Sequence, residues 1–174
     1  MNRDLVRLRP VGEADVDDIL GWVNDREIVG NLASFSGTPF SREDEVAYVR
    51  AMMASNVDRV FSVLAADDGR YVGQIGIHQI FWRSRVGRLS LVIGSKDEWG
   101  KGFGSAAIAR ILDLAFGHEE LHKIWLMVFR TNERSRRTYE RAGFTVEGTL
   151  REEYFHDGAW HDMVRMSMLS HEWS

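Results

Sequence analysis

Apolar and polar residues repeat with two different periods along the chain, and the changes of period divide it into strands and helices. Strict alternation over residues 5–9 predicts a short first strand, because successive side chains of a strand point to opposite faces. Apolar residues at positions 16, 19, 20 and 23 then recur at helical spacing. The chain is therefore expected to open with a strand and a helix.

A second helix is predicted to begin after Ser41. Serine accepts hydrogen bonds from the free amide groups at a helix start, and Asp44 complements the positive end of the helix dipole. The apolar stripe expected on this helix consists of Val46, Val49 and Met53.

Three consecutive strands are predicted over residues 60–65, 71–80 and 86–93. The turn Asp67-Asp68-Gly69 joins the first two of them. Because the connections are short, neighbouring strands are expected to pair antiparallel, so this part of the chain should form a meander.

Helical spacing returns after the meander, in the apolar residues Ile108, Ile111, Leu112 and Ala115. Gly117 is expected to end this helix, because glycine readily adopts the left-handed conformation that closes many helices. The mostly apolar segment Lys123–Phe129 then predicts a buried strand.

The last part of the chain supplies one more helix and a hairpin. Asn132 is predicted to cap a helix that ends at Gly143. Two alternating segments flank Asp157-Gly158, a dipeptide that favours tight hairpin turns. The order of elements predicts an α/β (α+β) fold, in which helices flank a mixed, mostly antiparallel central sheet.

The composition restricts the function classes. A chain of 174 residues with 44% hydrophobic residues is expected to form one domain over residues 1–174. Its net charge of -4 gives no basis for nucleic-acid binding, and no apolar run approaches the roughly 20 residues of a membrane span. With no signal-peptide pattern and no cysteine, we expect a cytoplasmic protein without cysteine nucleophiles or sulfur-bound zinc.

Acidic residues are concentrated near the start. The first 59 residues hold 11 acidic and 7 basic residues, whereas the remainder holds 15 of each. This acidic third either attracts a cationic small molecule or forms a solvated acidic helix surface, and the sequence leaves both interpretations open.

The segment Trp99-Gly100-Lys101-Gly102-Phe103-Gly104-Ser105 lies between a predicted strand and a predicted helix. Glycines let the backbone approach an anion closely, and the free amides of a helix start attract negative charge. The segment matches neither the phosphate loop of nucleoside triphosphatases nor the Rossmann glycine pattern. Its glycines are therefore consistent with a diphosphate site and equally with a flexible turn.

A second candidate group consists of Asn132, Ser135 and Tyr139. Their spacing of three and seven residues places them on one face of the next helix. Side by side, these polar groups are suited to binding a substrate. The same residues are also explained as a helix cap and a core aromatic ring.

These two segments, with Ala142-Gly143-Phe144 after them, together resemble the GNAT superfamily of acetyl-CoA-dependent N-acetyltransferases. The resemblance extends over nearly the whole chain. Residues 147–151 and the hairpin that contains Asp157, Gly158 and Asp162 further resemble the branch of ribosomal-protein, spermidine and amino-sugar acetyltransferases.

The resemblance implies a coenzyme site and one catalytic residue. The glycine segment is expected to hold the coenzyme A pyrophosphate, the end of strand 86–93 to pair with the pantetheine arm, and Tyr139 to face the thioester sulfur. The coenzyme-binding residues implied in this way are Val92, Ile93, Gly94, Trp99, Gly100, Lys101, Gly102, Phe103, Gly104, Ser105, Asn132 and Ser135. Trp99 departs from the family pattern, which has Gln or Arg there, and Lys101 is available as a substitute positive charge.

The expected reaction is direct transfer of an acetyl group from acetyl-CoA to a primary amine. Tyr139 is expected to donate a proton to the departing thiolate, since a phenol with a pKa of about 10 stays protonated at neutral pH. For the base, His78, Glu152, Glu153 and a chain of water molecules all remain candidates.

The acceptor amine stays open at this point. The acidic third favours a polyamine or an aminoglycoside, and the resemblance also includes amino sugars and the N-termini of ribosomal proteins. A non-catalytic acyl-CoA-binding module is the alternative outside the enzymes. No metal and no membrane or nucleic-acid partner is expected, and edge strands near the chain end are compatible with a homodimer.

One further motif competes with this interpretation. His118-Glu119-Glu120-Leu121-His122 matches the His-Glu-x-x-His pattern of zinc proteases. That chemistry requires both histidines on one continuous helix. The helix end expected at Gly117 and the strand expected from Lys123 leave no room for such a helix, so we interpret the match as accidental.

Overall fold

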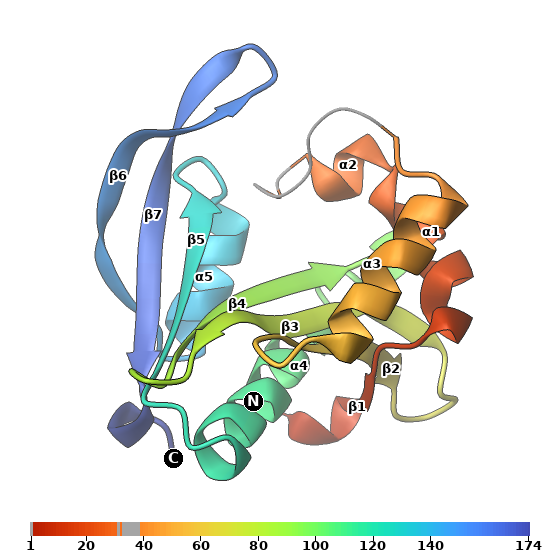
Figure 1. Cartoon of the computed structure of the whole chain (residues 1–174). Helices are drawn as coiled ribbons and strands as arrows, with labels where there is room; N and C mark the ends of the chain where they lie inside the picture. The colour runs from red at the N-terminus through yellow and green to blue at the C-terminus, as the bar shows by residue number, and fades with distance from the viewer. Residues whose placement is uncertain (1, 31, 33–38) are drawn as a thin grey trace.

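The computed structural model of the chain describes residues 2–30, 32 and 39–174 (Figure 1). The strands are β1 (Val6–Pro10), β2 (Arg59–Ala65), β3 (Tyr71–Phe81), β4 (Val86–Ile93), β5 (Lys123–Phe129), β6 (Thr145–His156) and β7 (Ala159–Leu169). The helices are α1 (Val16–Val23), α2 (Arg26–Val29), α3 (Arg42–Ala54), α4 (Phe103–Leu112) and α5 (Glu133–Arg141). Short 3-10 turns occupy Arg3–Leu5, Glu13–Asp15, Lys96–Glu98 and Ser170–Glu172. Among the helices of these ranges, none has both the length and the apolarity to cross a membrane.

The strands form one sheet in the order β1-β2-β3-β4-β5-β7-β6. Neighbouring strands pair antiparallel, except that β4 and β5 are parallel. The turn at Asp157 and Gly158 joins β6 to β7 with φ values of 48° and 77°, as the hairpin signal predicted. The expected fold, a mixed and mostly antiparallel sheet flanked by helices, is confirmed.

β4 and β5 pair only near one end. Val86–Arg88 lie opposite Lys123–Trp125, and beyond these pairs the two strands diverge (Figure 1). The rest of β4 continues to pair with β3, and the rest of β5 with β7. The sheet is therefore split in its middle while each half keeps its own hydrogen bonds.

Helices cover both faces of the sheet. α4 packs on β1, β3 and β4, and its buried residues share a large core with those of α5. α1 and α3 pack on each other and form a second apolar cluster that includes Val60 of β2 (Figure 1). Ile75 and Ile77 of β3 are fully buried, and each such side chain contributes about 1.5–3 kcal/mol through burial. The part of the sheet that comprises β1 to β4 is thus held between two layers of helices.

The predicted helix caps are confirmed at three positions. The Asp44 amide donates to the Ser41 hydroxyl at 3.2 Å, and the Ser41 amide donates to the Asp44 carboxylate at 2.8 Å. The Asn132 side chain accepts from the Ser135 amide at 3.1 Å. Gly143 follows α5 with φ of 98°.

The helical segment ends at His118, one residue after the end predicted at Gly117, but Gly117 does not adopt the predicted left-handed conformation. Helical structure continues after α4 as a π-helical turn over Asp113–His118. Positive φ occurs at Glu120, with a value of 50°, and not at Gly117. The buried Leu121 donates its amide to the Ala115 carbonyl at 2.8 Å, so this contact with the core makes the chain turn later than the glycine.

The stripe predicted on α3 is correct at Val49, which is fully buried, but wrong at Met53, which is 60% exposed. Met52, the residue before it, faces inward in this turn. α2 was not predicted, because its four residues are too few to show a period.

The His-Glu-x-x-His segment does not lie on one helix. His118 ends the π-helical turn, and His122 is the residue before β5. The geometry that a zinc protease needs is therefore not present at this segment.

Candidate active site

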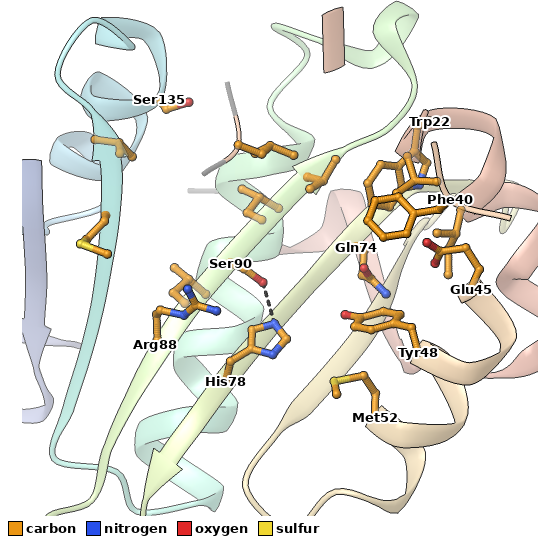
Figure 2. Close-up of a pocket in the computed structure, with 18 of the residues that line it drawn as sticks. Trp22, Phe40, Glu45, Tyr48, Met52, Gln74, His78, Arg88, Ser90 and Ser135 are labelled. Carbon is orange, nitrogen blue, oxygen red and sulfur yellow. Dashed lines mark hydrogen bonds between the residues drawn. The ribbon is translucent and has the colours of Figure 1, made fainter. Parts of the chain in front are cut away.

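A cavity of about 720 Å³ lies where β4 and β5 diverge (Figure 2). The central strands β3, β4 and β5 contribute its floor, α5 one wall, and α1 and α3 the opposite wall. Cavities of this volume bind small molecules. The two walls carry different chemistry.

Four of the residues predicted from the sequence line the cavity, three of them on the α5 wall. Asn132, Ser135 and Tyr139 line the cavity together with Val92 at the end of β4. The common face predicted for α5 is confirmed. Asn132 is both a helix cap and a cavity residue, so the two explanations of this side chain are compatible.

Tyr139 is the most deeply buried of these four residues, with 7% exposure. Its ring meets Phe144 edge-on, with the ring centroids 5.6 Å apart. Burial raises the pKa of the Tyr139 phenol above its ordinary value. The phenol therefore keeps its proton at neutral pH and can act only as a proton donor there.

The glycine segment forms the connection from β4 to α4. Gly100 and Gly102 have φ values of 81° and 94°, which other residues adopt only with strain. Gly102 is the N-cap of α4, so the helix begins with free backbone amides beyond it. The Lys101 ammonium is largely exposed and lies 3.4 Å from the Glu98 carboxylate. None of these residues is among those that line the cavity.

The two aromatic residues of this segment, Trp99 and Phe103, contact other parts of the protein. The Trp99 indole donates to the backbone carbonyl of Ile93 at 2.8 Å, and the Arg134 guanidinium lies 4.8 Å from the centre of the indole ring. Phe103 is buried in the main core. Trp99 therefore ties the loop to the end of β4.

Close packing also fixes the end of β4 at Gly94. A Cβ atom at Gly94 would lie 2.3 Å from the Trp22 ring, so only glycine fits there.

The last two residues of the segment lie in the first turn of α4. A Cβ atom at Gly104 would lie 3.5 Å from Leu91, which is an ordinary contact distance. Ser105 is partly exposed on the first turn of α4.

The opposite wall, formed by α1 and α3, brings carboxylates to the cavity. Asp44 and Glu45 of α3 line it, and Glu45 is only 4% exposed (Figure 2). Burial, with a smaller effect of Asp44, raises the pKa of the Glu45 carboxyl. Tyr48 lies one turn further along α3, and burial raises its pKa to about 12.

Most other acidic residues of the first third are already paired with cations. Ion pairs join Asp15 to Arg9, Asp17 to Arg42, Glu13 to Arg50, and both Asp25 and Glu27 to Lys96. The acidic third is therefore largely a paired surface. The acidic groups available to a ligand in the cavity are those of α3.

The floor of the cavity holds a chain of three hydrogen-bonded side chains. His78 of β3 and Ser90 of β4 line the cavity, and the His78 Nε2 to Ser90 Oγ distance is 2.8 Å (Figure 2). The other ring nitrogen, Nδ1, lies 3.1 Å from Asp58 Oδ1. The Asp58 carboxylate also accepts from the Ser55 hydroxyl at 2.6 Å and from the Gln79 amide at 3.1 Å.

The partners of the His78 ring define its tautomer. An ionised carboxylate only accepts hydrogen bonds, so His78 Nδ1 carries the proton and donates it to Asp58. In the neutral ring Nε2 then accepts from the Ser90 hydroxyl. Burial opposes ionisation of Asp58, but hydrogen bonds from Ser55 and Gln79 outweigh it, and the pKa of Asp58 is lowered.

Sequence reasoning included His78 among several candidate bases but missed Asp58 and Ser90. Glu152 and Glu153, the other candidates, do not line the cavity. The missing signal is the strand register, which places Ser90 opposite Gly76, two residues from His78 on the same face of β3.

The residues at the split fit coenzyme A. Beyond Arg88, β4 is not paired by β5, so its backbone groups can hydrogen-bond to an extended amide chain in the cavity. The amides at the start of α4 and the left-handed glycines before it form a cradle for a diphosphate. A cavity with a buried proton donor and a neighbouring diphosphate cradle is consistent with an enzyme that transfers a group from a coenzyme carrying a diphosphate.

Comparison with known proteins identifies this class. The family model described as an Acetyltransferase (GNAT) domain matches residues 6–145. The chain therefore belongs to the GNAT acetyltransferase family. It is an acyltransferase that uses acetyl-CoA as co-substrate.

Its relatives include enzymes with known acceptors. Spermidine N(1)-acetyltransferase from Vibrio cholerae serotype O1 is 31% identical over 170 residues, which are 97% of this chain and 95% of that protein. The putative ribosomal N-acetyltransferase YdaF of Bacillus subtilis is 34% identical over 106 residues, 61% of this chain and 57% of the relative. A crystal structure of spermidine N-acetyltransferase from Vibrio cholerae in complex with CoA and spermine has a TM-score of 0.89 at 29% identity, and the match covers 97% of this chain and 98% of that one. The superfamily and branch predicted from the sequence are confirmed.

Proposed function

We propose that the protein transfers the acetyl group of acetyl-CoA to a primary amine of a cationic small molecule of the polyamine class. The observation that carries this proposal is the cavity with two unlike walls. One wall presents Tyr139 beside the end of β4, and the other presents Asp44 and Glu45. A cationic amine held by the α3 carboxylates extends toward the phenol, and the spermidine acetyltransferases among the relatives support this acceptor class.

The coenzyme site follows from the same geometry. The amides around Gly100 and Gly102 and the start of α4 bind the diphosphate, and Lys101 adds a nearby positive charge. Val92, Ile93 and Gly94, at the end of β4 beyond its pairing with β5, bind the pantetheine arm, and Asn132 and Ser135 contact it from α5. Trp99, whose indole is bonded to the Ile93 carbonyl, braces the loop instead of binding phosphate.

Tyr139 is the proton donor of the reaction in this proposal. Acetyl-CoA, when bound, supplies an acetyl group attached to a thiol leaving group with a pKa of about 8.5. The buried phenol is protonated at neutral pH and gives its proton to the sulfur as the bond to the acetyl carbon breaks. The proton lost from the amine nitrogen during amide formation balances this donation.

The test is an acceptor panel with purified protein and acetyl-CoA. Spermidine, spermine, an aminoglycoside, an amino sugar and a ribosomal-protein N-terminal peptide are compared by release of free thiol and by mass spectrometry of the product. We expect the polyamines to give the highest kcat/KM. A preference for the peptide contradicts the acceptor class, and tight acetyl-CoA binding without any amine-dependent release supports a non-catalytic module.

We propose further that two copies associate through the β6–β7 hairpin. β6 is an edge strand of the sheet, and Phe155 and Trp160 are exposed near the hairpin turn with their rings 5.1 Å apart. Light scattering of the protein and of a Trp160→Ser variant tests this proposal. A monomeric wild-type protein contradicts it.

The predictions of a single domain over residues 1–174, a cytoplasmic location, and no metal, membrane or nucleic-acid partner stay predictions.

A further inference from the structure

The reaction needs a proton acceptor that the α5 wall does not supply. An alkylamine has a pKa near 10, so the acceptor arrives as an ammonium ion without a free electron pair. Tyr139 keeps its proton, and β4, which lies between the two walls, carries no carboxylate. The group that takes up the proton of the ammonium must therefore lie elsewhere on the cavity surface.

The hydrogen-bonded chain Asp58–His78–Ser90 has the required form. Ser90 Oγ and the His78 ring both border the cavity, and Asp58 lies behind the ring. Its three members come from the segment before β2, from β3 and from β4. The neutral ring presents an unprotonated Nε2 to the Ser90 hydroxyl, which leaves the oxygen of that hydroxyl free to accept a proton.

Two features of the backbone hold the ring in this position. A Cβ atom at Gly76 would lie 2.8 Å from His78 Nε2, so the absence of a side chain there lets the ring lie across β3 toward Ser90. Directly after His78 the register is interrupted, and Gln79 has φ of 52°. This irregularity turns the Gln79 amide toward the Asp58 carboxylate, which fixes the carboxylate behind the ring.

We infer that the Asp58–His78–Ser90 chain takes up a proton from the ammonium group of the amine substrate. The N–H bond of the ammonium breaks as Ser90 Oγ takes the proton, and the hydroxyl proton of Ser90 passes to His78 Nε2. The products are a neutral amine and an imidazolium ion, so charge and protons balance without any other reactant. Asp58 is a positioning residue that holds the tautomer and stabilises the imidazolium. This inference rests on the proposed acetyl transfer to an amine.

The charges around the ring agree with this role. Burial, with a smaller effect of the Arg88 guanidinium, lowers the pKa of His78 despite the neighbouring Asp58 carboxylate. Tyr48 and Glu45 face this region from α3, and Tyr48 is neutral at pH 7. The ring is therefore unprotonated at neutral pH. Because its pKa lies below the ordinary value of about 6.5, kcat/KM should decline only when the pH falls below about 6.5.

The experiment measures kcat/KM for spermidine between pH 5 and pH 9 together with acetyl-CoA binding by calorimetry. We expect His78→Gln to lower kcat/KM by about 100-fold at pH 7.5, to remove the His78 ionisation from the low-pH decline and leave only that of Glu45, and to leave the Kd for acetyl-CoA unchanged. Ser90→Ala should cause a similar loss, and Ser90→Thr, which keeps a hydroxyl, should restore part of the rate. His171→Gln, at an exposed histidine of the last 3-10 turn, is the matched control and should match the wild type.

Asp58→Asn provides a second way to test the relay if His78→Gln does not fold. The Asn side-chain oxygen still accepts from His78 Nδ1 and from the Gln79 amide, but the negative charge that stabilises the imidazolium is lost, so we expect a loss of about 10- to 100-fold with a displaced low-pH decline. A wild-type rate and unchanged pH profile in Asp58→Asn or Ser90→Ala overturns the inference, as does a folded His78→Gln within twofold of wild type.

Two further outcomes separate this inference from its alternatives. Acetylation of Ser90 by acetyl-CoA in the absence of amine, detected by mass spectrometry, would show a nucleophile in place of a relay and also overturns the inference. If the wild-type protein releases no thiol with any amine, the proposed function itself fails, a result that is distinct from an active wild type with an unaffected His78→Gln.

Discussion

The two sides of the cavity are built in different ways. The coenzyme side consists mainly of backbone: left-handed glycines, the first amides of α4 and the stretch of β4 that β5 does not pair with. The acceptor side consists of side chains, with Glu45 on α3 and the chain Asp58–His78–Ser90 on the floor. A backbone site requires particular residues in a short segment, whereas a side-chain site joins residues that are distant in sequence.

Because the two sides differ in this way, substitutions on the coenzyme side and on the acceptor side should have different effects. On the coenzyme side a new side chain mainly disturbs the path of the backbone, so acetyl-CoA affinity should change for every acceptor alike. On the acceptor side a substitution removes one charge or one proton acceptor, so the amine KM or kcat should change at constant acetyl-CoA affinity. Four variants test this division, and they are ordered here by the size of the expected effect.

Tyr139→Phe should have the largest effect, because it removes the proton donor at the boundary of the two sides. We expect kcat to fall by about 100-fold while the Kd for acetyl-CoA stays the same. Steady-state kinetics and calorimetry measure the two quantities. The Tyr139 side chain is buried, so a melting temperature close to that of the wild type is the control for folding. Turnover at the wild-type rate removes Tyr139 from the mechanism.

Glu45→Gln should raise KM for a polyamine by about 10- to 30-fold, because it removes a buried charge opposite the cationic amine. The Kd for acetyl-CoA should not change. Glu43→Gln is the matched control, since Glu43 lies in the same first turn of α3 but is exposed and does not line the cavity. Equal KM values for the two variants contradict a role of Glu45 in amine binding.

Gly102→Ala should weaken acetyl-CoA binding by about fivefold and lower the free energy of unfolding by about 1 kcal/mol. The φ of 94° strains an alanine, and the loop relieves this strain by turning the peptide away from the coenzyme. Gly117→Ala is the control, because Gly117 has neither positive φ nor a close neighbour. An unchanged Kd for acetyl-CoA in Gly102→Ala is incompatible with a diphosphate cradle at this loop.

Lys101→Ala should have the smallest effect, a two- to threefold increase in the Kd for acetyl-CoA at low salt that disappears at high salt. The Lys101 ammonium is exposed and already close to Glu98, and such surface charges contribute about 0.2–1 kcal/mol. Calorimetry at two ionic strengths measures this difference. A loss of tenfold or more would place Lys101 in direct contact with the phosphates.

Most of the fold follows from local sequence patterns. The alternating segments became β1 to β4, and the caps at Ser41 and Asn132 start α3 and α5 as predicted. The left-handed conformation expected at Gly117 was wrong, because the buried contacts of Leu121 outweigh a local preference. The split between β4 and β5 could not be predicted, since no residue within either strand signals where their pairing stops.

The candidate site likewise has one part that the sequence predicted and one part that it did not. The glycine segment and the face of α5 were predicted because their residues lie within a few positions of one another. Asp58 and Ser90 were not, because 20 and 12 residues separate them from His78, and only the register of β3 with β4 and the irregularity at Gln79 join the three. Assigning a proton acceptor thus required the folded sheet.

The short pairing of β4 with β5 also has a mechanical consequence. In the described part of the chain, a short backbone junction joins the two halves of the sheet: Val86–Arg88 pair with Lys123–Trp125, and His122 and Lys123 donate to the Arg85 carbonyl. A small rotation about this junction would widen the far end of the gap and break few backbone hydrogen bonds. We therefore expect the enzyme to accept acyl groups somewhat longer than acetyl.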